Sequence, residues 1–121
     1  MRYLALLYWD EDRRVSPASP EYDRVLAAYA EVNRSFQDAG VMVDAAPLEN
    51  TDTAVSVRVR KGETMVTDGP FAETKERLGG YYLLDCANRD EAVRLAVQIP
   101  AVQHGTIEVR PVMSIPPRAP E

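Results

Sequence analysis

The order of apolar patterns along the chain constrains its fold more than any single motif, because a strand–helix–strand succession occurs twice. Residues 3–8 are apolar throughout, which is typical of a short strand covered on both faces. A helix start follows at residues 19–21, where a capping serine, a proline and an acid stand in that order. Apolar residues then recur at helical spacing over residues 22–39, and Gly40 ends the helix. Residues 41–45 alternate and predict a second strand.

The second half of the chain begins with a predicted hairpin. Valines alternate with polar residues over residues 55–60, and Lys61-Gly62 supplies a tight turn into a second strand at residues 63–67. Regular structure is expected to break at residues 68–71 and again at Gly79-Gly80.

The strand–helix–strand order then returns. Residues 81–86 predict a strand, and Asn88 with Glu91 resembles a capping box that opens a helix. Pro100 stops this helix, and a last strand is expected from Thr106 to Pro111 or just beyond it. The chain therefore predicts an α+β ferredoxin-like fold, an antiparallel sheet with two helices on one face.

The other face of this sheet has no element left to cover it. The first strand carries apolar residues on both sides, with Leu4 and Leu6 on one and Ala5 and Leu7 on the other. An uncovered apolar face usually marks a partner, and closed two-fold dimers are the commonest solution. We therefore expect a homodimer that packs two sheets face to face.

Length and charge narrow the class of protein. The 121 residues predict one domain, which we place at residues 1–114, followed by a disordered tail at residues 115–121. The net charge of −5 argues against nucleic acid or an anionic membrane as a direct partner. No apolar stretch is long enough to span a bilayer, and the first apolar run lacks a cleavage site, so a cytoplasmic location is expected.

Neither a metal nor a cofactor is expected. The lone Cys86 excludes an internal disulfide and a cysteine-based metal cage, and it is expected to pack as a small hydrophobe. His104 has no second histidine or cysteine pair at a recognised ligand spacing. Gly79-Gly80 lacks the remaining residues of a dinucleotide or phosphate-binding loop.

Residues 68–82 are the segment most suited to chemistry. This stretch contains five charged residues, three glycines and three aromatic residues, and loops on a rigid scaffold often carry function. The alternative is a surface connection in which Gly69 and Pro70 form a turn, Phe71 fills the core and the charges are solvated.

The run from Asp68 to Cys86 resembles the DGPF-type branch of the YCII-related family, and patterns at residues 3–6, 57–60 and 107–112 are similar to that family. The resemblance implies a dimeric α+β barrel with a pocket near the Asp68 loop. It also implies a regulatory or accessory role, because relatives are often encoded beside sigma factors of the extracytoplasmic-function type. Some members of the wider family have a proposed His/Asp pair, which does not transfer here because Ala87-Asn88 stands where the acid is expected.

Two residues are candidates for acid–base catalysis. Asp68 would act as a general base if it were buried beside a tyrosine, since desolvation raises the pKa of a carboxyl group. The alternative is that its carboxylate accepts backbone N–H bonds within the turn. His104 is the candidate helper, because its unperturbed pKa lies near neutrality.

Other side chains are candidates for ligand binding. Charged and aromatic groups near the same loop are the candidates, namely Phe71, Glu73, Lys75 and Tyr82. The alternatives are a solvated charged face and aromatic residues of the core. Arg58, Arg60 and Arg110 could bind a carboxylate, or they could be exposed or form dimer salt bridges.

Three functions are compatible with these residues. The first is a homodimeric module that binds a small molecule or serves as an accessory protein linked to sigma-factor regulation. The second is a cofactor-free enzyme in which Asp68 moves a proton on a small substrate. The third is a structural interaction protein without a pocket.

Overall fold

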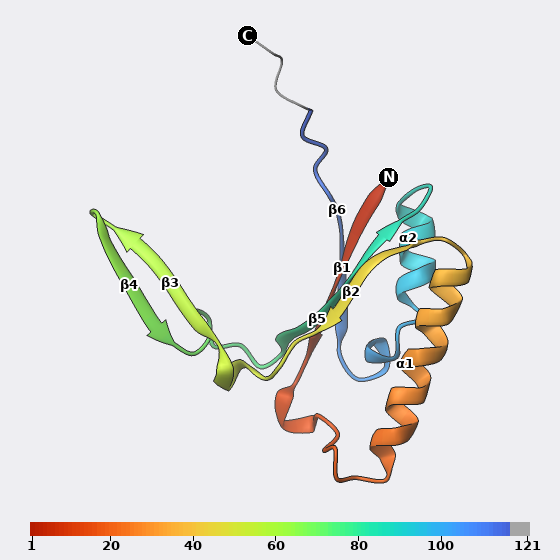
Figure 1. Ribbon diagram of the computed structural model, residues 1–121, viewed down its shortest axis with the longest axis horizontal. Coiled ribbons are helices and arrows are strands. Elements are labelled where there is room, and N and C mark those ends of the chain that lie inside the picture. The colour runs from red at the N-terminus through yellow and green to blue at the C-terminus, as the bar shows by residue number, and fades with distance from the viewer. Residues whose placement is uncertain (117–121) are drawn as a thin grey trace.

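A four-stranded antiparallel sheet with helices on one face forms the body of the protein (Figure 1). The computed structural model describes residues 1–116 of the chain. The strand order is β2-β5-β1-β6, and the strands span β1 Arg2–Trp9, β2 Met42–Pro47, β5 Arg77–Asp85 and β6 Thr106–Pro111. This arrangement confirms the predicted α+β fold with two helices on an antiparallel sheet.

The two helices are α1 (Glu21–Asp38) and α2 (Arg89–Ala96). The end of α1 and the start of α2 lie where the sequence predicts, but α2 ends at Ala96, before the Pro100 that was expected to stop it. Gly40 follows α1 with φ of +71°, and its N–H donates to Gln37 O at 3.0 Å, which is typical of a glycine that terminates a helix. At the start of α2, Asn88 Oδ1 accepts a hydrogen bond from Glu91 N at 2.9 Å.

A second sheet consists only of the hairpin formed by β3 (Val55–Arg60) and β4 (Glu63–Asp68). Figure 1 shows that this hairpin projects on the side of the main sheet opposite the helices. The predicted turn is confirmed, since Lys61 and Gly62 have φ of +52° and +78°, the left-handed conformations that a two-residue hairpin turn requires. We call this hairpin the arm.

The core lies between the helices and the main sheet. Strand β1 alternates along its length, so that Tyr3, Ala5 and Leu7 are buried. The largest fully buried side chains are Phe36, Leu84 and Ile99. The rings of Phe36 and Tyr82 meet edge to face at 5.8 Å, and the Tyr82 hydroxyl donates to Asn33 Oδ1.

The opposite face of the main sheet is apolar at its centre and charged at its edges. Leu4 pairs with Leu83 and Leu6 pairs with Tyr81 on the two central strands. These side chains are half-buried by their neighbours within the sheet. No helix among residues 1–116 covers them (Figure 1). We call this surface the open face.

The predicted break at Gly79-Gly80 is wrong, because both glycines lie inside β5. Gly80 pairs with Leu7 while Leu78 pairs with Tyr8, so Gly79 is the extra residue of a β-bulge. A Cβ atom on Gly79 would lie 2.0 Å from Trp9 Cζ2. The glycine therefore allows the indole ring to lie against the backbone of β5.

The surface-connection alternative required Phe71 to fill the core. This part of it is wrong, because 79% of Phe71 is exposed. Cys86 is buried with Tyr3 and Ala92, which confirms its packing as a small hydrophobe. Most of the tail predicted to be disordered, residues 117–121, lies outside the described residues. No helix in residues 1–116 has the length and apolar character needed to cross a membrane.

Candidate functional site

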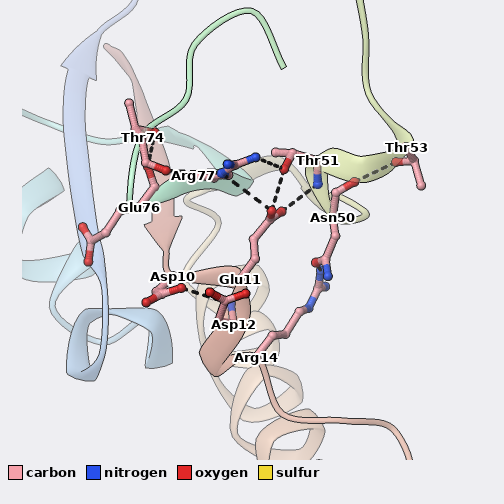
Figure 2. A network of polar contacts seen from close by, with 10 residues as sticks. All are labelled: Asp10, Glu11, Asp12, Arg14, Asn50, Thr51, Thr53, Thr74, Glu76 and Arg77. Atoms are coloured by element: carbon pink, nitrogen blue, oxygen red, sulfur yellow. Dashed lines mark hydrogen bonds and ion pairs between the residues drawn. The ribbon is translucent and has the colours of Figure 1, made fainter. Parts of the chain in front are cut away.

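A polar cavity of about 530 Å³ opens where three segments meet beside the end of the main sheet (Figure 2). Strand pairing explains the meeting, because Trp9 at the end of β1 lies opposite Arg77 at the start of β5. The segments that leave β1 and enter β5 therefore lie side by side. The third segment is the connection between β2 and the arm. Together they supply the lining residues Asp10, Glu11, Asp12, Asn50, Thr51, Asp52, Gly69, Pro70, Thr74, Lys75 and Arg77.

A three-residue network ties these segments together. Glu11, in the short 3₁₀ helix η1 (Glu11–Arg13), accepts two hydrogen bonds from Thr51, from its backbone N–H at 2.7 Å and its hydroxyl at 2.6 Å. Arg77 donates to the same Thr51 hydroxyl oxygen, and its Nε lies 3.9 Å from Glu11 Oε1. The Glu11 side chain is only 16% exposed, so this ion pair is better shielded from water than a surface pair. We call Glu11, Thr51 and Arg77 the cavity network.

Two arginines, Arg77 and Arg14, make further contacts in the cavity wall. Arg77 Nε donates to Thr74 O at 3.2 Å, which fixes the segment that enters β5. Arg14 donates to Leu48 O at 3.2 Å and to Asn50 Oδ1 at 2.7 Å. The Arg14 guanidinium also lies over the Trp9 ring, 5.4 Å from its centroid. The wall is thus anchored to the indole that rests on Gly79.

The charges that line the cavity are mostly negative once the cavity network is set aside. Asp12, Asp52 and Lys75 make no side-chain hydrogen bond or ion pair with any residue in the described part of the chain. Asp10 Oδ1 accepts the Asp12 backbone N–H at 3.0 Å. Asp10 Oδ2 also lies 4.0 Å from Arg13 Nε. Asp12, Asp52 and Lys75 therefore leave one net negative charge at the cavity, together with the polar groups of Asn50 and Thr74.

A second cavity of about 490 Å³ shares the wall formed by Asn50 and Asp52. Its other side is formed by residues 14–22 and 47–49. No three His, Cys, Asp or Glu side chains within residues 1–116 are grouped so that they could hold a metal ion.

The structure brings one of the predicted site residues to the first cavity, namely Lys75. Gly69 and Pro70, which directly follow Asp68, also line it. Asp68 itself is exposed at the end of β4, where it pairs with Val55. The burial that the acid–base hypothesis requires for its carboxyl group is therefore not present in the single chain.

The remaining predicted residues lie elsewhere. Phe71 and Glu73 are exposed and line neither cavity, and His104 is exposed after the 3₁₀ helix η3 (Pro100–Gln103). Tyr82 lies in the core, where burial, with a smaller effect of nearby Tyr29, raises the pKa of its hydroxyl to about 12. Its hydroxyl is therefore neutral near pH 7.

The sequence analysis missed most of the cavity. Asp10, Glu11 and Asp12 lie in a charged stretch after the first predicted strand, and Asn50, Thr51 and Asp52 lie between two predicted strands, so neither group carries a local signal for a site. The pairing of Trp9 with Arg77 would have indicated that these segments lie close together, but this pairing depends on the order of strands in the sheet. No local spacing in the sequence connects residues that are forty positions apart, as Glu11 and Thr51 are.

Comparisons with known proteins agree with this architecture. The family model of the YCII-related domain matches residues 1–116. An uncharacterized protein of Rhizobium meliloti (strain 1021) is 41% identical over 114 residues, which cover 93% of this chain and 92% of the relative. The match extends over the sheet, both helices, the arm and the cavity, and the chain belongs to the YCII-related domain family.

Proposed function

We propose that this protein is a binding module for a small, polar, positively charged molecule, and that the first cavity is its binding site. The observation that carries this proposal is the cavity network, which holds three distant segments around a preformed polar cavity. Cavities of 300–1,000 Å³ are typical of small-molecule sites, and about 530 Å³ falls within that range.

The charges of the cavity favour an amine as ligand. Asp12 and Asp52 lack side-chain partners among residues 1–116, and a carboxylate binds an ammonium group through charge-assisted hydrogen bonds. Lys75 and Asn50 can bind hydroxyl or carbonyl groups elsewhere on the same molecule.

The experiment is titration of the ¹⁵N-labelled protein with putrescine and, separately, with citrate. We expect putrescine to shift backbone amide resonances around Asp12, Asp52 and Lys75, and citrate to leave them in place. The double variant Asp12→Asn with Asp52→Asn should lose the response, while Asp23→Asn on the exposed surface of α1 should keep it. Equal responses in all three proteins, or none in the wild type, would contradict the proposal.

We also propose that the protein is a homodimer formed through the open face. Leu4, Leu6 and Leu83 form an apolar strip across the central strands, and charged residues border it on the edge strands β2 and β6. Packing the open faces of two such sheets face to face gives the dimeric barrel that the family resemblance implies. Leu6→Glu should give a folded monomer in sedimentation experiments, whereas Ser35→Glu on α1 should leave the dimer intact.

Four narrower predictions remain open. They are the DGPF-type branch, the cytoplasmic location, the link to a sigma factor and the acid–base role of Asp68 with His104. Copurification from the native host tests the sigma-factor link, and absence of any sigma factor from the purified material would remove it. The acid–base role requires a substrate whose turnover falls in Asp68→Asn.

A further inference from the structure

The arm has one face that carries four valines, and these are exposed in the single chain. The register places Val57 directly opposite Val66, and Val55 and Val59 flank this pair on the same face. These four valines are 57–64% exposed. Thr64 and Asp68, which pair with Val59 and Val55, lie on the same face as the valines. The opposite face carries Ser56, Arg58, Arg60, Glu63, Met65 and Thr67. The alternation of valines with polar residues along β3 is typical of a sheet with one buried face.

Nothing in the described part of the chain covers the valine face. The arm is attached at its root, where Gly69 N donates to Ala54 O at 2.7 Å and the Ser56 hydroxyl donates to Gly69 O at 2.8 Å. Beyond the root the arm extends away from the sheet and the helices (Figure 1). An isolated two-stranded hairpin is marginally stable in water, so this conformation needs a third element against the valines.

We infer that the valine face of the arm packs against a second copy of this chain, so that each subunit of the dimer holds the other with its arm. This inference rests on the dimer proposed above and adds a second contact to it. The arm lies on the same side of the main sheet as the open face (Figure 1). A second copy docked on the open face therefore lies on the side toward which the arm projects.

The area of the open face supports a second contact. Four strands about 4.8 Å apart and roughly 23 Å long cover on the order of 450 Å². A stable interface usually buries about 800 Å² on each partner. The valine face of the arm adds exposed apolar surface on the same side of the sheet and so enlarges the area available to a second copy.

The charges of the arm and of the rest of the chain also favour a second copy of this chain as the partner. The arm, residues 55–68, carries three cations, Arg58, Arg60 and Lys61, and two carboxylates, Glu63 and Asp68, so its charge is +1. The whole chain has a charge of −5, so the remaining residues carry −6. A basic arm that extends away from its own acidic body meets opposite charge on another copy of that body.

Two neighbouring positions on opposite faces of the arm provide a matched test. Val66→Lys places a charge on the valine face, and Thr67→Lys places the same charge on the other face. Both positions are exposed in the single chain, so neither substitution should unfold the protein. We expect Val66→Lys to weaken the dimer at least tenfold in sedimentation experiments and Thr67→Lys to change its dissociation constant less than threefold.

The outcomes separate the two proposals. A monomeric wild-type protein would overturn both the dimer and the arm contact. A dimer that is weakened by Leu6→Glu but equally insensitive to Val66→Lys and Thr67→Lys would leave the dimer standing and overturn the arm contact.

A second measurement locates the arm directly. A spin label is attached to the variant Glu63→Cys, near the arm tip, in a Cys86→Ala background. This spin-labelled protein is mixed with ¹⁵N-labelled wild-type protein. We expect broadening of amide resonances on the body of the ¹⁵N-labelled subunit. Unchanged resonances in a mixed dimer would show that the arm points into solvent and would overturn the inference. Binding of the arm to a DNA duplex without loss of the dimer would also overturn it.

Discussion

Strand β1 and the arm share a sequence pattern but have opposite environments. In β1, every second residue from Tyr3 to Trp9 is buried beneath the helices. In β3 and β4, the alternating valines of the arm are more than half exposed. The difference teaches that alternation specifies which face of a strand needs a cover, whereas the connections between elements decide whether the same chain provides it.

The physical reason lies in the order of the elements. Each strand–helix–strand succession returns a helix onto the main sheet and covers one face of it. The arm is inserted between β2 and β5, and no α-helix precedes or follows it within this insertion. Its valines can therefore be covered only from outside the described part of the chain, and for the same reason the arm contributes little to the stability of the body.

The largest difference between the two regions should appear when a buried and an exposed apolar side chain are shortened. Leu84→Ala removes a fully buried side chain and should lower the free energy of unfolding by about 2–5 kcal/mol. Val66→Ala in the arm should change it by less than about 0.5 kcal/mol in dilute, monomeric protein. Urea denaturation measures both, and equal losses would show that the arm is part of the cooperative core.

Two glycines provide a smaller contrast. Gly79→Ala forces a methyl group into the Trp9 indole and should destabilise the whole protein by about 1–3 kcal/mol. Gly62→Ala has free space around the new methyl group but places alanine at φ of +78°, at a cost of about 1–2 kcal/mol to the turn. Hydrogen exchange should show faster opening confined to the arm for Gly62→Ala. A global loss in that variant would contradict the comparison.

Removing one local hydrogen bond from each region should have a still smaller effect. Asn88→Ala deletes the side-chain cap of α2 and should lower the free energy of unfolding by about 1 kcal/mol. Ser56→Ala deletes the hydroxyl bond to Gly69 O at the root of the arm. We expect it to leave the thermal midpoint unchanged while arm resonances broaden. A lower midpoint in Ser56→Ala would show that the root is coupled to the core.

One further effect concerns pH and is confined to the core. The pKa of Tyr82 rises from 10.0 to about 12 on folding because burial disfavours the phenolate. The folded state therefore binds the Tyr82 proton more tightly, and this contribution to stability is complete below pH 10 and is lost as the pH rises from 10 to about 12. When the absorbance of tyrosinate is followed against pH, the step at the highest pH should be absent in Tyr82→Phe. An unchanged titration would contradict the burial of this hydroxyl.

Most elements of the fold could be predicted because their signals are local. Gly40 ends α1, Lys61-Gly62 turns the arm, and Asn88 caps α2, each through contacts within a few residues. The error at Gly79-Gly80 has the opposite cause. Glycine pairs usually interrupt a strand, but here Trp9, seventy positions earlier, requires the absence of a side chain at Gly79.

The candidate site was predictable only in part for the same reason. Lys75 and the turn at Gly69 belong to the segment that the sequence singled out, and both line the cavity. Glu11 and Thr51 become neighbours only because β1 and β5 pair in one sheet. Of the aromatic residues in that segment, Tyr82 is buried and Phe71 is exposed. Their aromatic character alone could not predict this difference in burial.

The sequence by itself determined the succession of strands and helices, their caps and turns, and which faces of the strands are apolar, because these depend on residues close together in the chain. Only the tertiary structure decided that β1 and β5 are neighbours, that Glu11, Thr51 and Arg77 enclose a cavity, and that the arm extends from the body with its valines uncovered. The physical reason is that contacts between distant segments follow from the order of strands in the sheet, and alternation along a strand carries no information about its neighbour.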